Sequence, residues 1–231
     1  HGTRTSPVCA AAEPWNLPGR RHQPQGISLC QLPLRFPAAR SGISVSVPAG
    51  KKVYIKATTN QWADDVSNYN YIQWNYTIGG NIMSLIYGDN FADKFSFPTN
   101  SYLNFYRLFG TGISSNSPVD VMNLLMPATT LTEGCYSDMF DNSRFEISPE
   151  LPAHTLAENC YGSMFYRCSK LNVVKCYMEG NQPVDLTLCT LNWLSGVAAN
   201  GLFIKSPNAT WPTGVSGIPD GWEVQDNTIL N

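Results

Sequence analysis

Short runs of alternating apolar and polar residues mark the part of the chain that follows residue 40. Residues 43–47 and 53–57 place apolar side chains on one face at a period of two, and Pro48-Ala49-Gly50 lies between them. Residues 71–78 and 81–87 follow, separated by Gly79-Gly80, which can supply the positive φ of a tight turn. The pattern predicts an antiparallel β unit over residues 43–88.

A segment of 14 residues beginning at Pro127 is repeated 25 residues later at Pro152, with nine positions identical. The first copy reads PATTLTEGCYSDMF and the second PAHTLAENCYGSMF. In each copy a Thr precedes a Glu by three residues, which is the arrangement of a helix-capping box. Apolar residues then recur every four positions, as on one face of a short helix: Leu131, Cys135 and Met139 in the first copy, and Leu156, Cys160 and Met164 in the second.

Extended stretches at 119–125, 145–147 and 171–176 separate these segments, so each unit of about 25 residues should hold one short strand and one short helix. An earlier, degenerate unit falls at 104–109, where Phe109 takes the place of Phe140 at a spacing of 31. The fold class that we predict is an α/β repeat arranged as a short solenoid. An antiparallel β unit precedes the repeats, and a C-terminal cap follows them.

The repeats resemble those of the BspA-like leucine-rich repeat family of bacterial surface and secreted proteins. The resemblance rests on residues 126–140 and 151–165, and extends to 48–57, 80–89 and the ending at 193–224. It covers residues 45–226 and implies a leucine-rich-repeat solenoid with an interaction role, such as adhesion. Family units usually place a Cys three residues after the Met-Phe pair, which Cys168 satisfies and Ser143 does not.

Four segments follow from these patterns: an atypical Pro/Arg-rich extension (1–42), an N-terminal β unit (43–100), BspA-like leucine-rich repeats (101–180) and a C-terminal cap (181–231). Residues 1–52 carry seven cationic side chains against Glu13 alone, and the remaining residues sum to −8. We interpret 1–42 as a disordered or tag-derived extension, with a basic arm or a segment that wraps the β unit as the alternatives.

Composition narrows the classes of partner. Of 231 residues, 43% are hydrophobic and 14% charged, with a net charge of −2, so nucleic acid is not an expected partner. No apolar run is long enough to span a membrane. The chain begins at His1 without an apolar signal segment, and we expect a secreted or cell-surface protein whose signal lies outside this sequence.

No catalytic, cofactor or metal site is predicted. The cysteines number seven, and we expect Cys135 and Cys160 to be buried thiols, with a Cys160–Cys168 or Cys168–Cys189 disulfide as the alternative. Three His residues are scattered, and His154 is best explained as a variable repeat position. A carboxylate pair for glycoside hydrolysis could be drawn from several acids: Asp138, Asp141, Glu146, Glu150 and Glu158.

We therefore expect a non-enzymatic, adhesin-like domain that binds a host or neighbouring-cell protein or glycan; the oligomeric state stays open. Its outward variable positions are Thr129/His154, Asp138/Ser163, Asp141/Tyr166 and Asn142/Arg167. Carbohydrate binding through exposed aromatics is the alternative, with candidates Trp62, Tyr69, Tyr71 and Trp74, and a glycoside or ester hydrolase is a third. Three further aromatics, Trp193, Trp211 and Trp222, should cover the end of the core, although glycan stacking is an alternative role.

Overall fold

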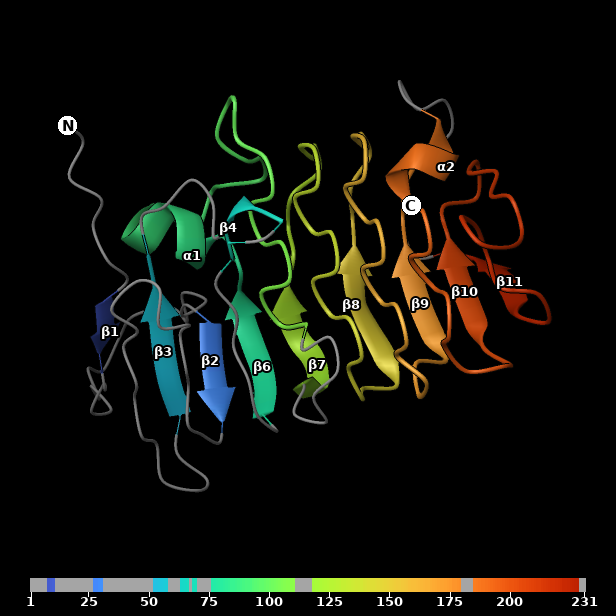
Figure 1. Cartoon of the computed structure of the whole chain (residues 1–231), viewed down its shortest axis with the longest axis horizontal. Coiled ribbons are helices and arrows are strands. Elements are labelled where there is room, and N and C mark those ends of the chain that lie inside the picture. The colour runs from blue at the N-terminus through green and yellow to red at the C-terminus, as the bar shows by residue number, and fades with distance from the viewer. Residues whose placement is uncertain are drawn as a thin grey trace.

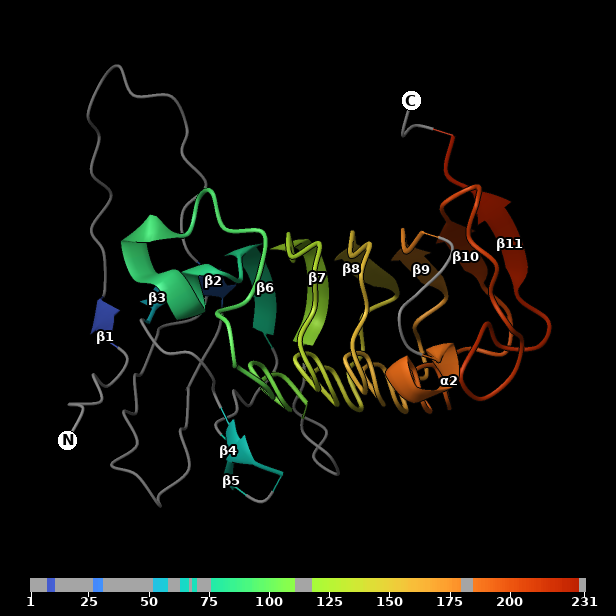
Figure 2. The ribbon, with the colours of Figure 1, turned by 90° about the horizontal axis from the view of Figure 1, so that it is seen from above.

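The strands of the two main sheets stand side by side in one row, and a layer of stacked turns runs opposite them (Figure 1, Figure 2). This computed structural model describes residues 8–10, 27–30, 52–57, 63–66, 68–69, 76–110, 118–179 and 185–228. Two main sheets make up the row, one of five strands and one of four.

The five-stranded sheet has the order β1-β3-β2-β6-β7. Its pairs β1–β3, β3–β2 and β2–β6 are antiparallel, whereas β6 and β7 are parallel. Two of the strands come from the Pro/Arg-rich extension, so this part of the chain contributes backbone to the sheet. The strands are β1 (Val8–Ala10), β2 (Ile27–Cys30), β3 (Lys52–Lys56), β6 (Tyr76–Asn81) and β7 (Pro118–Leu125).

The predicted turn at Gly79-Gly80 is wrong, because both glycines lie inside β6. A Cβ on Gly79 would come within 3.1 Å of the Cβ of Asn123 in β7, so close strand approach explains this glycine. The expected strand at 81–87 is instead a turn started by Asn81, whose Oδ1 accepts from the Met83 amide at 2.9 Å. The short helices α1 (Ser84–Tyr87) and η1 (Gly88–Asn90) follow.

Apart from the main sheets, β4 (Ala63–Asp65) and β5 (Asn68–Tyr69) pair as a small antiparallel ribbon. Of the first predicted hairpin, residues 53–56 lie in β3, and residues 43–47 lie outside the described residues.

The four-stranded sheet is parallel throughout, in the order β11-β10-β9-β8. Inward side chains such as Val174 and Phe203 lie in register on β9 and β10 and are fully buried. The C-terminal region therefore extends the same sheet. The strands are β8 (Ile147–Leu151), β9 (Val173–Cys176), β10 (Leu202–Lys205) and β11 (Glu223–Asp226).

Successive turns occupy the places of the predicted repeat helices. Four layers of turns stack along the molecule, which we number first (103–110), second (131–143), third (156–168) and fourth (186–196). In the second layer every other amide closes a turn, as Met139 does onto the Tyr136 carbonyl oxygen at 3.2 Å. The amides between them donate to the third layer, as Phe140 does to Met164 at 2.9 Å. This alternation links the layers as strands of a sheet are linked.

Left-handed backbone at every fourth residue excludes a helix in these layers. In the third layer Asn159, Ser163 and Arg167 have φ of 53°, 50° and 59°. An α-helix needs a negative φ at each residue. The expected capping boxes are absent for the same reason, and Thr130 instead forms a parallel bridge with Thr155 and with Ser96. The one α-helix in the four layers is α2 (Leu186–Cys189), with Asp185 as its N-cap.

Stacked aromatic rings fill the core between the strands and the turns. Phe140 lies between Phe109 and Phe165, with ring centroids 5.6 and 5.7 Å apart, so the 31-residue spacing identified the earlier unit. Tyr136 stacks on Tyr161 at 6.0 Å in a second column. Each ring repeats the position of the one in the neighbouring layer, and the core is therefore continuous from layer to layer.

The predicted fold class is wrong. The repeats contain a strand and turns but no helix, and the N-terminal sheet is not antiparallel throughout, because β6 and β7 are parallel. Among the described residues α1 and α2 have four residues each and η1 has three. The architecture is two sheets containing parallel strands, with few helices, and it is not clearly a short leucine-rich-repeat solenoid.

Candidate functional site on the stacked turns

The left-handed residues of the four layers stand in columns on the outer side of the turns. One column holds Leu103, Gly134 and Asn159; the next holds Arg107, Asp138, Ser163 and Asn192; the third holds Asn142, Arg167 and Gly196. Inter-layer hydrogen bonds fix these positions, as between the Arg107 amide and the Ser137 carbonyl oxygen at 3.1 Å. We call this outer surface the turn face.

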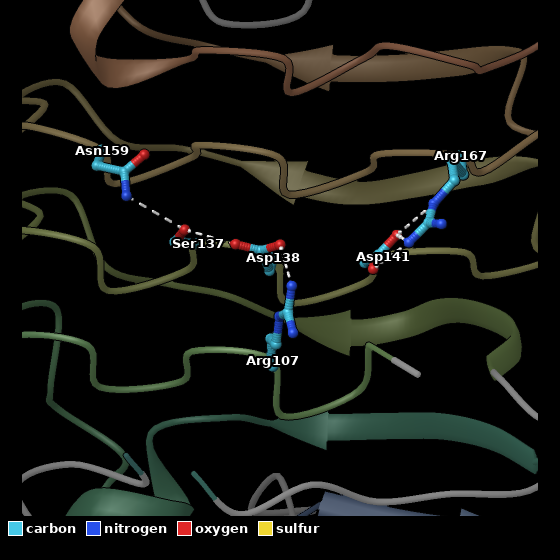
Figure 3. Close-up of polar contacts among 6 residues, drawn as sticks. All are labelled: Arg107, Ser137, Asp138, Asp141, Asn159 and Arg167. Carbon is cyan, nitrogen blue, oxygen red and sulfur yellow. Dashed lines mark hydrogen bonds and ion pairs between the residues drawn. The ribbon is translucent and has the colours of Figure 1, made fainter. Parts of the chain in front are cut away.

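A row of polar contacts crosses the turn face over the first three layers (Figure 3). The Arg107 guanidinium donates to Asp138 Oδ1 at 3.2 Å, and the Ser137 hydroxyl donates to Asp138 Oδ2 at 3.1 Å. The Asn159 amide group donates to the Ser137 Oγ at 3.3 Å. Side chains from three layers thus hold one carboxylate, which leaves Arg107 32% and Asp138 18% exposed.

A second ion pair lies beside the first on the turn face. Arg167 of the third layer contacts both carboxylate oxygens of Asp141 in the second layer, with Nη2–Oδ2 at 2.9 Å. The Arg167 guanidinium also lies 4.8 Å from the ring centroid of Tyr166. Asp141 is only 1% exposed, whereas Arg167 is 43% exposed. The carboxylate and the ring therefore hold the cation in place, and part of the guanidinium side chain stays exposed.

Burial controls the electrostatics of this pair. Desolvation raises the pKa of Asp141, and the Asp138 charge raises it further, against the lowering effect of Arg167 and Arg107. The four charged groups therefore act on one another, and they sum to zero. The surface alternates in sign over a short distance and carries no single-sign field that would attract a polyanion.

The turn face becomes apolar at its C-terminal end. Leu188 and Leu191 in the fourth layer are half exposed. Val215 is similarly exposed, and the adjacent Ser216 is bonded to this layer, since its carbonyl oxygen accepts from the Thr190 hydroxyl at 2.7 Å. Leu191 adjoins the third layer at Ser163, since its carbonyl oxygen accepts from the Ser163 amide at 2.8 Å, so exposed apolar side chains follow the charged layers along the stack.

The structure places the predicted variable positions in two different regions. Asp138/Ser163, Asp141/Tyr166 and Asn142/Arg167 belong to the turn layers. Thr129/His154 lies before the turns: the Thr129 amide donates to the Phe95 carbonyl oxygen at 2.9 Å, and His154 pairs with Glu179 at 3.3 Å. The expectation that Asp141 points into solvent is wrong, because its side chain is buried under Arg167.

The carboxylate and aromatic candidates from the sequence also lie in different parts of the structure. Of the proposed carboxylates, Asp138 and Asp141 come together with arginines, while Glu150 pairs with Lys175 on the strands at 3.3 Å. The C-terminal tryptophans Trp193, Trp211 and Trp222 are buried, and Trp193 lies inside the stack, between Tyr161 and Trp211. Of the glycan candidates, Trp62, Tyr71 and Trp74 lie outside the described residues, and only the backbone of Tyr69 is described.

The five cysteines with described side chains are free and buried, and they include Cys135 and Cys160, as predicted. Burial raises the pKa of the Cys176 thiol to about 12. In the described part of the chain no group of three or more His, Cys, Asp or Glu side chains is arranged to hold a metal ion.

Three residues of the polar row were not identified from the sequence: Arg107, Ser137 and Asn159. The available signal was Gly134, Asp138 and Asn142 at every fourth residue of the second layer and Asn159 in the third, since Gly, Asp and Asn tolerate left-handed backbone. Arg107 was hidden because its layer is degenerate and lies 31 residues from the next.

Comparisons with known proteins add no assignment: no family model, no curated protein and no solved structure matches this chain. Within the described ranges, none of the helices has the length and apolarity needed to cross a bilayer.

Proposed function

We propose that this protein is a non-enzymatic, secreted or surface-exposed interaction domain of the adhesin type, and that its turn face recognises the partner. The observation that carries the proposal is the set of columns of outward side chains, each fixed by a left-handed backbone position and by hydrogen bonds between layers. The resemblance of residues 126–140 and 151–165 to BspA-like bacterial repeats supports the same class of function.

On such a surface, the residues that stabilise the fold differ from those that would contact a partner. The core depends on inward residues such as Phe140 and Tyr136, and the layers are held by backbone bonds, so outward side chains can vary without loss of the fold. A prearranged side chain loses little conformational entropy on binding, which favours affinity. Arg and Tyr are also the residue types that most often dominate binding energy at protein interfaces.

The chemistry of the turn face favours a protein as the partner. Arg167 and Tyr166 provide a cationic site, and Leu188 and Leu191 provide exposed apolar area in the next layer. Protein interfaces combine such an apolar region with a polar rim. Glycan binding usually relies on exposed aromatic rings, and the tryptophans with described side chains are buried.

Binding to purified proteins tests the proposal directly. The chain is measured by biolayer interferometry against immobilised extracellular-matrix and mucosal proteins, in parallel with a glycan array. We expect at least one protein to bind, and Tyr166→Ala combined with Arg107→Gln to weaken that binding about tenfold or more. Both substitutions leave the Asp141–Arg167 pair in place.

The matched control is Glu150→Gln, which changes an exposed charge on strand β8 away from the turn face. It should bind as the unmodified protein does. Binding to glycans alone would favour the carbohydrate-binding alternative. Equal loss in the control and the test variant would show that the turn face is not the recognition surface.

A further inference from the structure

Three cysteines stand in one column inside the second, third and fourth turn layers. The Tyr136 amide donates to the Cys160 carbonyl oxygen at 3.0 Å, and the Tyr161 amide donates to the Cys189 carbonyl oxygen at 2.9 Å. Cys135, Cys160 and Cys189 therefore belong to successive layers, and all three are fully buried. Residues that face each other across hydrogen-bonded neighbours lie about 5 Å apart, which is within the Cα separation of a disulfide.

The thiols of this column are not equivalent. The Cys160 and Cys189 side chains interact with each other, and the Cys189 thiol also donates to the Asp185 carbonyl oxygen at 3.4 Å within its own layer. The Cys135 thiol interacts with Thr132. The interaction with Cys160 lowers the pKa of the Cys189 thiol, while burial raises that of Cys160. The two side chains therefore lie next to each other in adjacent layers, which is the arrangement that a disulfide needs.

We infer that Cys160 and Cys189 form an inter-layer disulfide when the folded protein meets an oxidised thiol. This pairing differs from the two considered from the sequence, which both require Cys168. The Cys168 thiol instead donates to the Phe140 carbonyl oxygen at 3.0 Å and so is engaged with the second layer. The inference does not depend on the proposed function.

The chemistry is thiol–disulfide exchange with an oxidised disulfide such as glutathione disulfide. The Cys189 thiolate attacks one sulfur of the oxidant and displaces the first glutathione thiolate, which gives a mixed disulfide. Cys160 then loses its proton and attacks the Cys189 sulfur, and the second glutathione thiolate leaves. Two electrons pass to the oxidant, and the two cysteine protons end on the two glutathione thiols.

The position of Cys189 provides a route for the oxidant. Cys189 is the last residue of α2, a helix of one turn in the terminal layer of the stack. Such end elements open locally more readily than the centre of a fold. Once formed, the disulfide ties the fourth layer to the third and opposes this opening.

The test treats the folded full-length chain with glutathione disulfide, blocks the remaining thiols and maps linked peptides by mass spectrometry without reduction. Trypsin and a glutamyl endopeptidase are both used, because Glu179 separates Cys176 from Cys189. We expect a Cys160–Cys189 linkage and a higher midpoint of thermal unfolding, and we expect dithiothreitol to reverse both.

Two variants and one control complete the experiment. Cys160→Ser and Cys189→Ser should lose the linkage and the rise in the midpoint, and Cys176→Ala, another buried thiol, should retain both. Because the linkage is measured on the unmodified protein, poor folding of a variant does not decide the result. A linkage of Cys160 to Cys135, or no linkage at Cys189 in the folded chain, would overturn the inference.

Discussion

Arg167 holds the carboxylate of Asp141 across two neighbouring layers of turns. The guanidinium Nη2 lies 2.9 Å from Oδ2, and Nε lies 3.3 Å from Oδ1. The carboxylate is almost completely buried, whereas the arginine is partly open to solvent. The pair therefore connects the second layer to the third through side chains, in addition to the backbone ladder.

Removal of the arginine should destabilise the protein. Arg167→Ala leaves the buried Asp141 carboxylate without its cation, and we expect the free energy of unfolding to fall by about 1–3 kcal/mol. Chemical denaturation measures the change. Combining Arg167→Ala with Asp141→Asn should cost less than the sum of the two single changes, because the buried charge is then absent. If the free-energy change of the double variant equalled the sum of the two single changes, the ion pair would contribute nothing to stability.

The stability of the protein should depend on pH through Asp141. Burial raises the pKa of this carboxyl in the folded state, so folding favours its protonated form. Its contribution to stability is present below the unfolded pKa of about 4 and is lost as pH rises through the higher folded pKa. The stability of the unmodified protein relative to Asp141→Asn should therefore fall as the pH rises from below the unfolded pKa through the raised folded pKa. Denaturation at several pH values measures this difference, and a rising difference would show that Arg167 outweighs burial.

The stacked rings should contribute much of the stability of the layers. Phe140 is fully buried between Phe109 and Phe165, so Phe140→Ala should cost about 3–5 kcal/mol in the free energy of unfolding. Phe95 is 54% exposed, and Phe95→Ala serves as the matched control with a cost of about 1 kcal/mol or less. Similar losses in the free energy of unfolding for both variants would show that the stacked ring contributes no more to stability than an exposed one.

Much of the repeat packing could be predicted from the sequence. The recurrence of Cys135, Tyr136 and Met139 at 25 residues identified inward positions, because equivalent side chains of stacked units occupy equivalent places. The burial of Cys135 and Cys160 followed from the same pattern, whereas Trp193 was expected to cover the core from the C-terminal cap. The spacing of apolar residues shows directly which side chains face the core, and so these features could be predicted.

The local backbone could not be predicted in the same way. Apolar residues every four positions fit a helix with 3.6 residues per turn about as well as a four-residue turn over so short a length, and helix was the commoner interpretation. The pairing of β2 with β3 and β6, and the contact of Asp141 with Arg167, join distant residues. Neither leaves a periodic signal in a single sequence.

The relative stability of Ser163→Gly and Ser163→Ala distinguishes a turn from a helix in the third layer. Ser163 has a φ of 50°, so Ser163→Gly should be more stable than Ser163→Ala by about 1 kcal/mol, because glycine adopts left-handed backbone without strain. In a helix the order would be reversed by a similar amount. Urea denaturation of the two variants measures the difference. As a second position, Gly134→Ala should be destabilising, since φ there is +58° and the new Cβ would lie 2.7 Å from Leu103 Cδ2. A more stable alanine at both positions would show that these layers are helical in solution.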